Sequence, residues 1–109
     1  MSLIEPAVEY KPTHKNVQAI VIPDYTKFLD DPEKCTQFIE ELEDFANSNS
    51  PHYNYVVNKR RYGDEYYFAI EENITFIQLK PGNYLLKNSH GKVSSLKPEE
   101  FSKLYIKLE

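Results

Sequence analysis

The sequence predicts a small α+β domain in which a curled antiparallel sheet of five or six short strands packs on one main amphipathic helix. Helical spacing of apolar residues is clearest between residues 32 and 46, whereas alternating aromatic and polar residues fill the second half of the chain. Proline and glycine turns separate those alternating segments. At 109 residues the chain is long enough for one core. We therefore expect an extended N-terminal arm over residues 1–15 and a single domain over residues 16–109.

The main helix is expected to begin with Asp31 as its N-cap and Pro32 in its first turn. Apolar residues then recur at i, i+3, i+4, i+7, i+10 and i+11, and they are Cys35, Phe38, Ile39, Leu42, Phe45 and Ala46. The polar run at 47–51 ends the helix. Before it, the segment 17–22 (VQAIVI) is apolar on both faces except at Gln18, which is typical of an interior strand.

Two tight turns and a short helix organise the C-terminal third. Pro81 fixes φ at about −65°, and Gly82 supplies the positive φ that a type II turn needs at its third position. Gly91 is expected to be left-handed in the next turn, at 88–91. Pro98 suits the first turn of a terminal helix. The apolar stripe of that helix comprises Phe101, Leu104, Tyr105 and Leu108.

Between the two helices the pattern predicts a series of hairpins. The first strand, 52–58, places Tyr53, Tyr55 and Val57 on one face, and 61–64 turns the chain into a second strand at 65–71. A turn at 72–73 leads into a further strand.

The turn sequence at 81–84 (PGNY), with Gly91 further on and an aromatic helix at 100–105, resembles the PGDYG-type small proteins of phages and prophages. Near the N-terminus, 10–12 (YKP) followed by 17–20 (VQAI) is similar to the opening of such proteins. The resemblance implies an accessory protein in the cytoplasm of a bacterial host, and it implies no catalytic residues. In this chain Asn83 stands in place of the usual aspartate, and Leu85 in place of glycine or an aromatic residue.

Composition narrows the classes of function. The net charge of −4 argues against general affinity for nucleic acid or anionic membranes. A single cysteine, Cys35, excludes an internal disulfide and suits a reducing compartment. No apolar run approaches the roughly 20 residues of a membrane-spanning helix, and no signal peptide is recognisable, so we expect a cytoplasmic protein without a membrane partner.

Residues able to carry chemistry are few and do not converge. His14, His52 and His90 fall in the arm, a loop and a turn, without metal-ligand spacing. Cys35 lies on the apolar helix face, where a packing role is expected rather than a nucleophile. The adjacent glutamates 71–72 and 99–100 diverge, because neighbouring residues point to different sides of a strand or helix. We therefore predict no catalytic, metal-binding or cofactor-binding residues and a protein that is not an enzyme.

A hairpin rich in tyrosine and basic residues is the predicted interaction surface. Tyrosine and arginine are enriched at protein-binding hot spots, and they also stack on single-stranded nucleic acid. The alternative is that several of these tyrosines fill the sheet face. An exposed aromatic strand could also pair with its own copy in a homodimer. The candidate residues are Tyr53, Tyr55, Lys59, Arg60, Arg61, Tyr62, Tyr66 and Tyr67.

The second candidate surface is acidic, with eight carboxylates between Asp24 and Asp44. A charged outer face is what any amphipathic surface helix requires, but a partner-binding surface that mimics nucleic acid would have the same composition. The sequence thus favours a non-enzymatic protein-interaction module. A nucleic-acid-binding protein using the hairpin at 53–67, and an acidic inhibitor that mimics nucleic acid, are the alternatives.

Overall fold

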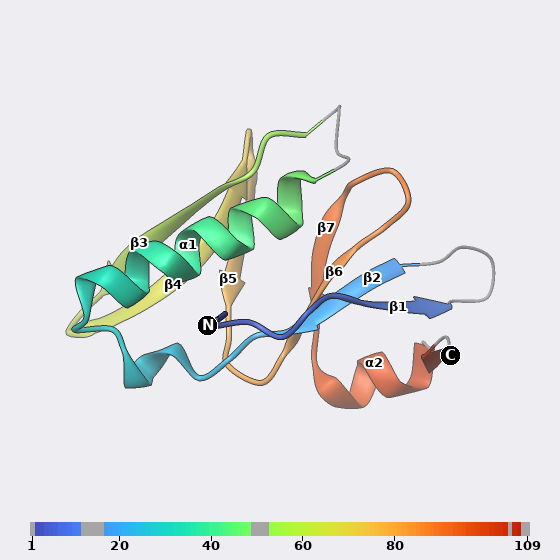
Figure 1. Ribbon diagram of the computed structural model, residues 1–109, viewed down its shortest axis with the longest axis horizontal. Helices are drawn as coiled ribbons and strands as arrows, with labels where there is room; N and C mark the ends of the chain where they lie inside the picture. The colour runs from blue at the N-terminus through green and yellow to red at the C-terminus, as the bar shows by residue number, and fades with distance from the viewer. Residues whose placement is uncertain (1, 12–16, 49–52, 105, 108–109) are drawn as a thin grey trace.

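Two antiparallel sheets and one long helix build the fold of this protein (Figure 1). The computed structural model describes residues 2–11, 17–48, 53–104 and 106–107. The larger sheet has the strand order β7-β6-β2-β1-β8, and the smaller has the order β3-β4-β5. The α+β class is confirmed. Within these described residues there are eight strands in two sheets, where the sequence predicted five or six strands in one sheet.

The strands of the larger sheet are β1 (Val8–Lys11), β2 (Val17–Val21), β6 (Tyr84–Lys87), β7 (Val93–Leu96) and β8 (Ile106–Lys107). Strand β1 lies between β2 and β8 and pairs antiparallel with both. The segment predicted as an N-terminal arm therefore contributes a strand to the sheet. Strand β2 is flanked by β1 and β6, as its apolar sequence predicted.

The smaller sheet consists of β3 (Val56–Tyr62), β4 (Glu65–Glu72) and β5 (Thr75–Leu79). The turn between β3 and β4 is shorter than expected: Gly63 and Asp64 form it, and residues 61 and 62 continue the strand. Asn73, in the turn between β4 and β5, has a positive φ of 53°, a conformation that asparagine tolerates better than most residues.

The main helix, α1 (Pro32–Asn47), begins as predicted. The Asp31 carboxylate accepts hydrogen bonds from the backbone N–H groups of Glu33 and Lys34, at 3.1 and 3.2 Å. Its buried residues are Cys35, Phe38, Leu42, Phe45 and Ala46. The predicted apolar stripe is thus confirmed, with Ile39 half-buried at its margin.

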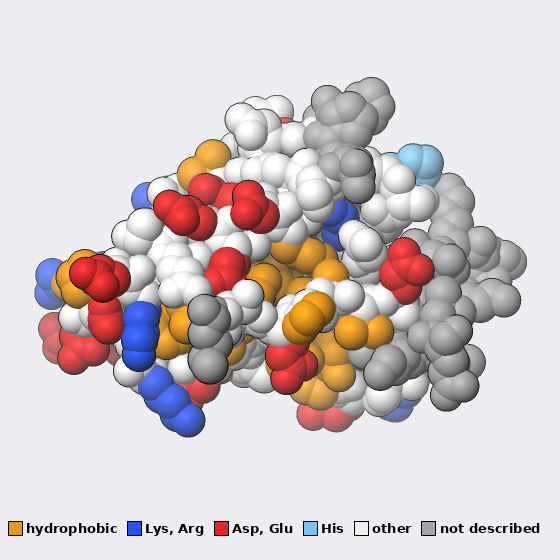
Figure 2. Space-filling model, viewed as in Figure 1, with side chains coloured by type: hydrophobic (Ala, Val, Ile, Leu, Met, Phe, Trp, Pro, Cys, Tyr) orange, Lys and Arg blue, Asp and Glu red, His pale blue; other side chains and the backbone are white. Residues whose placement is uncertain are grey.

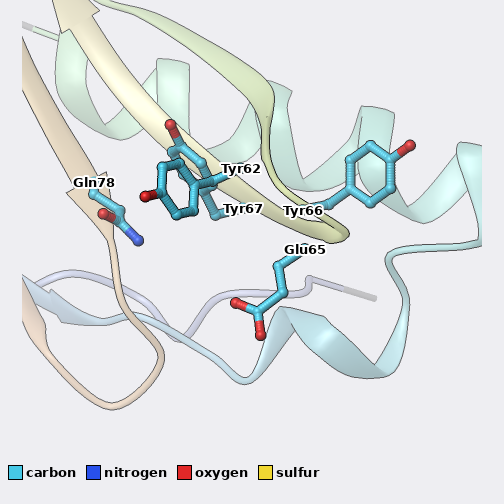
Figure 3. A pocket seen from close by; sticks show the side chains of 5 residues that line it. All are labelled: Tyr62, Glu65, Tyr66, Tyr67 and Gln78. Atoms are coloured by element: carbon cyan, nitrogen blue, oxygen red, sulfur yellow. The ribbon is translucent and has the colours of Figure 1, made fainter.

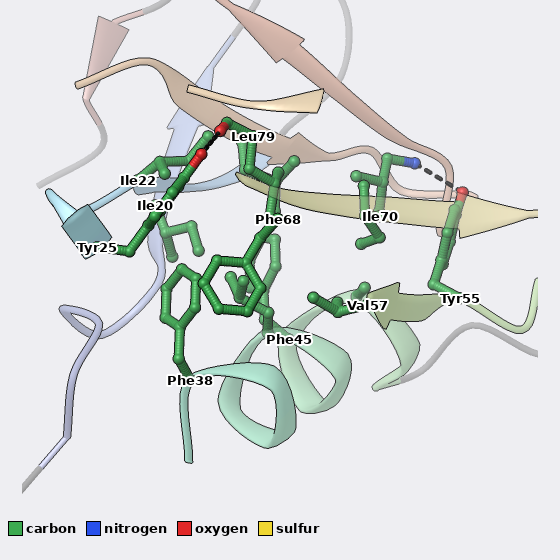
Figure 4. Packing of buried hydrophobic residues seen from close by; sticks show 14 of the residues in the cluster. Ile20, Ile22, Tyr25, Phe38, Phe45, Tyr55, Val57, Phe68, Ile70 and Leu79 are labelled. Carbon is green, nitrogen blue, oxygen red and sulfur yellow. Dashed lines mark hydrogen bonds between the residues drawn. The ribbon is translucent and has the colours of Figure 1, made fainter. Parts of the chain in front are cut away.

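One hydrophobic core joins α1 to both sheets (Figure 4). Ile20 and Leu85 enter it from the larger sheet, and Phe68 and Ile70 from the smaller one. The short 3₁₀ helix η1 (Tyr25–Lys27) adds the buried Tyr25, whose hydroxyl donates to the Leu79 carbonyl at 2.5 Å. Phe68 meets the rings of Tyr25 and Phe38 edge to face, with centroids 5.0 and 4.9 Å apart.

The terminal helix α2 (Pro98–Leu104) packs on the opposite face of the larger sheet. Phe101 stacks on Tyr84 with ring centroids 3.8 Å apart, and both lie beside Val17 and Leu86. Leu104 is exposed, contrary to the predicted stripe, because this seven-residue helix buries only the turn around Phe101. Tyr105 and Leu108 lie outside the described residues.

The two predicted glycine turns are confirmed. Gly82 has φ of 88°, and the Asn83 N–H donates to the Lys80 carbonyl at 3.1 Å. Gly91 also has φ of 88°, and its N–H donates to the Asn88 carbonyl at 3.0 Å. Across the described part of the chain, no helix is long and apolar enough to cross a membrane.

Candidate interaction surface on the three-stranded sheet

The hairpin of β3 and β4 carries most of the predicted interaction residues. Gly63, with φ of 62°, occupies the first position of its two-residue turn, as a type II′ turn requires. Across the hairpin, Tyr62 faces Glu65 and Arg60 faces Tyr67. Because side chains alternate along a strand, some of the predicted interaction residues lie on one face of this sheet and the others on the opposite face.

The core-side face of this sheet is buried through Val57, Phe68 and Ile70. The opposite face, which we call the outer face, comprises Val56, Asn58, Arg60, Tyr62, Glu65, Tyr67, Ala69, Glu71, Phe76 and Gln78. Much of the outer face is open to solvent: Tyr62 is 81% exposed and Phe76 is 51% exposed. Tyr67 is half-buried, and its ring lies edge to face against that of Phe76, with centroids 6.5 Å apart.

Tyr55 does not belong to an interaction surface, because it is only 3% exposed. Its hydroxyl accepts a hydrogen bond from the Val93 backbone N–H at 2.9 Å (Figure 4). Burial raises the pKa of this hydroxyl above its usual value. Tyr53 is half-buried and stacks on Tyr55, with ring centroids 5.7 Å apart. The alternative that tyrosines fill the core therefore holds for Tyr55.

Lys59, Arg61 and Tyr66 gather at the hairpin tip on the core-side face. Tyr66 is 46% exposed. Its ring lies 5.0 Å from the Lys59 ammonium and 5.8 Å from the Arg61 guanidinium carbon. Lys59 also donates to the Leu29 carbonyl at 2.7 Å, which ties the hairpin to the segment before α1. Of the Tyr66 and Tyr67 pair, Tyr66 is thus the more exposed member.

Arg60 forms a bidentate ion pair with Glu71 on the outer face. Arg60 Nε lies 3.0 Å from Glu71 Oε2, and Nη2 lies 2.6 Å from Oε1. The hydrogen bonds from Arg60 hold the pKa of the Glu71 carboxyl below its usual value, and those to Glu71 raise the pKa of Arg60. Asn58 adds a third donor to Glu71 at 3.2 Å. The paired N–H donors of the Arg60 guanidinium are therefore already bound to Glu71 within the protein.

A small pocket of about 250 Å³ opens at the hairpin end of the outer face (Figure 3). Its lining residues are Tyr62, Glu65, Tyr66, Tyr67 and Gln78. Tyr62 and Tyr67 both line the pocket, and the ring of Tyr66 points away from theirs. Glu65, Phe76 and Gln78 were not among the predicted site residues. In the register of β5 on β4, Gln78 lies opposite Ala69 and Phe76 lies opposite Glu71. This register brings Phe76 and Gln78 onto the outer face.

A second hollow of about 550 Å³ lies between the N-terminal segment, β2 and α1. Figure 2 shows its hydrophobic floor with acidic side chains around it. Ile4, Ile20 and Phe45 supply apolar lining, and Glu41 binds the backbone N–H groups of Leu3 and Ile4. The sequence did not predict this hollow, because it depends on how the N-terminal segment crosses α1.

Four of the eight carboxylates in the predicted acidic surface have structural roles. Asp24 and Asp31 cap η1 and α1. Glu41 binds the N-terminal segment, and Glu43 accepts from the Val57 N–H at 2.9 Å. These contacts give half of the predicted acidic surface a structural role within the fold.

The remaining residues considered for chemistry are Cys35 and the three histidines. Cys35 is free and buried, as predicted, and its thiol donates to the carbonyls of Phe28 and Leu29 at 3.4 and 3.5 Å. His90 is exposed in its turn, and His14 and His52 lie outside the described residues. Within the described residues, no group of three His, Cys, Asp or Glu side chains could hold a metal ion.

Comparison with known proteins finds no matching family model, no similar curated protein and no similar solved structure. The resemblance to PGDYG-type phage proteins stays a prediction.

Proposed function

We propose that this protein is a non-enzymatic interaction module that binds a protein partner through the outer face of the three-stranded sheet. The observation that carries the proposal is the exposure of Tyr62 and Phe76 beside Tyr67 on one sheet face. Aromatic side chains provide large contact areas with few rotatable bonds, and they are enriched where proteins bind one another. The Arg60–Glu71 pair supplies a polar margin of fixed geometry.

Tyr62 and Phe76 are not part of the hydrophobic core, whereas Tyr67 packs partly against it. Phe68, Ile70 and Leu79 supply the core from the opposite, core-side face, and each is 0% exposed. Ile74, which is 96% exposed in the turn between β4 and β5, adds further apolar area at the far end of the sheet. Exposed apolar side chains gathered on one face are the feature that distinguishes a binding surface from scattered surface hydrophobics.

The distribution of charge favours a protein over nucleic acid on this face. Glu65 and Glu71 lie on it, and the positive charge of Arg60 is offset by Glu71. The cations Lys59 and Arg61 lie on the other side of the sheet around Tyr66. Single-stranded nucleic acid would therefore bind at Tyr66, whereas a protein partner would bind at Tyr62 and Phe76.

Matched variants distinguish protein binding on the outer face from binding at Tyr66. Tyr62→Ala and Phe76→Ala remove outer-face aromatics, and Tyr66→Ala removes an aromatic of the same hairpin from the opposite side. We expect the three variants to fold and the first two to lose partners that the parent protein and Tyr66→Ala still capture from a host lysate. Retention of every partner by the double variant Tyr62→Ala/Phe76→Ala would refute the proposal.

Two further measurements complete this test. Light scattering of the same variants shows whether the partner is a second copy of the chain, because a homodimer through the outer face would dissociate in the double variant. Salt-sensitive retention on single-stranded DNA that is lost in Tyr66→Ala would instead support the nucleic-acid-binding alternative.

A further inference from the structure

The pocket at the hairpin end of the outer face combines tyrosine rings with a carboxylate. Tyr62 and Tyr67 form its aromatic wall, Glu65 lies below them, and Gln78 closes one side (Figure 3). The face of an aromatic ring carries negative electrostatic potential and attracts cations. Rings and carboxylate therefore favour the same kind of ligand, which is a positively charged one.

The charge of Glu65 is not compensated within the described residues, none of which pairs with its carboxylate. Arg60, which faces Tyr67 across the hairpin, is bound by both oxygens of Glu71. Arg61 donates to the Gly63 carbonyl at 2.7 Å and lies by the ring of Tyr66. A cation from outside the chain would thus meet an available carboxylate.

The neighbouring ring shows that this hairpin already binds cations through aromatic faces. Tyr66 has the Lys59 ammonium at 5.0 Å and the Arg61 guanidinium carbon at 5.8 Å, both within the roughly 6 Å range of cation–π contacts. Tyr62 and Tyr67 have no such cation among the described residues. Their rings are therefore available to an external ligand.

The size of the pocket restricts the ligand to one small group. Its volume of about 250 Å³ is below the roughly 300–1,000 Å³ of sites for drug-sized ligands and cofactors. A primary ammonium is a compact and strongly hydrated charge. A quaternary ammonium has no N–H groups to satisfy, and aromatic faces suit it best.

We propose that this pocket binds a quaternary ammonium group, with Tyr62 and Tyr67 contacting its methyl groups and Glu65 balancing its charge. The group could be free or could be the side chain of a trimethylated lysine, and the second case rests on the proposed function because a protein partner then carries it.

The experiment compares choline with its neutral isostere 3,3-dimethylbutan-1-ol. Both are titrated into the ¹⁵N-labelled protein while the backbone amide resonances of residues 62, 65, 67 and 78 are followed by NMR. We expect choline to shift these resonances in a saturable manner, and the isostere and ethanolamine to shift them much less. Equal binding of choline and the isostere, or of choline and ethanolamine, would overturn the proposal, as would no binding of choline.

Three variants assign the effect to the pocket. Tyr62→Leu keeps an apolar side chain but loses the ring face, and Glu65→Gln keeps the shape but loses the charge. Each should weaken choline binding by about 2- to 5-fold, as expected for one exposed cation–π contact or one exposed ion pair. Leu104→Ala, at an exposed position of α2 outside the pocket lining, should bind choline as the parent does. Choline affinity unchanged by both Tyr62→Leu and Glu65→Gln would also overturn the proposal.

A short peptide containing trimethyllysine distinguishes the two sources. Tighter binding of this peptide than of choline, with no binding of its unmodified lysine counterpart, supports a methylated protein partner; equal binding of the peptide and choline supports a free head group. Partner capture that depends on Tyr62 and Phe76 without choline binding would leave the proposed function standing and refute only this inference.

Discussion

Asn47 pairs with the backbone of Tyr55 as a neighbouring strand would. The Tyr55 N–H donates to Asn47 Oδ1 at 2.7 Å, and Asn47 Nδ2 donates to the Tyr55 carbonyl at 2.9 Å. Asn47 is the last residue of α1, and Glu43 one turn earlier accepts from the Val57 N–H. The end of the helix thus covers the exposed edge of the chain leading into β3, where unpaired backbone groups could otherwise recruit another strand.

Replacing Asn47 by Ala should lower the free energy of unfolding by about 1–3 kcal/mol, because two partly buried backbone groups lose their partners. Denaturant unfolding followed by circular dichroism measures this change. Asn47→Asp keeps the acceptor but loses the donor, so an intermediate loss is expected. Asn54→Ala, at an exposed position nearby, is the control and should change stability by less than about 0.5 kcal/mol.

Features fixed by neighbours in the sequence could be predicted from it. The start of α1 depends on Asp31 and Pro32, whose capping and backbone geometry act within one turn. The turns at Gly82 and Gly91 depend on positive φ, which glycine adopts without steric cost. The apolar spacing of α1 likewise identified its buried residues.

Features that depend on distant pairing could not be predicted. The division into two sheets follows from β6 joining β2 across more than sixty residues of sequence, in the register that puts Ile20 opposite Leu85. The ion pair that binds the Arg60 guanidinium depends on Glu71 lying near it across the hairpin. Tyr55 resembled a surface tyrosine because the hydrogen bond that satisfies its hydroxyl comes from Val93, on the other sheet.

Gly82→Val should lower the free energy of unfolding by about 1–3 kcal/mol, the cost of a β-branched residue held in strained backbone geometry. The cause is the φ of 88°, since a Cβ at this position would meet no atom within 4 Å. Gly82→Asn should cost less, because asparagine tolerates positive φ. Equal melting temperatures for the Val variant and the parent protein would show that the turn adjusts freely.

Cys35 should react slowly with a thiol reagent in the native protein and rapidly in denaturant. Its side chain is buried on α1 and donates to two carbonyls of the preceding segment. Since it is the only cysteine in the sequence, mass spectrometry after timed labelling reports on it directly. Native labelling as fast as that of a small-molecule thiol would contradict the burial of this helix face.

Lys87 at the end of β6 is buried, with 5% of its surface exposed. Its ammonium donates to the Phe45 carbonyl at 2.7 Å and to Ser48 Oγ at 3.0 Å, at the C-terminal end of α1. A cation is favourable at this negative end of the helix dipole. Burial nevertheless lowers the pKa of Lys87 from its usual value of 10.5, because the charged form loses hydration.

This lowered pKa predicts a pH dependence that Lys87→Met should abolish. Between the folded-state pKa and 10.5, the unfolded chain holds a proton on Lys87 that the folded protein has released. Raising the pH therefore favours folding in that window, with a slope of at most about 1.4 kcal/mol per pH unit for one group. Tyr25 and Tyr55, whose pKa values are raised by burial, act in the opposite direction above pH 10, but they are present in both proteins and cancel in the comparison. Urea unfolding of parent and variant from pH 7 to 10.5 gives the difference directly, and a difference that is flat with pH would mean that Lys87 is as well solvated as an exposed lysine.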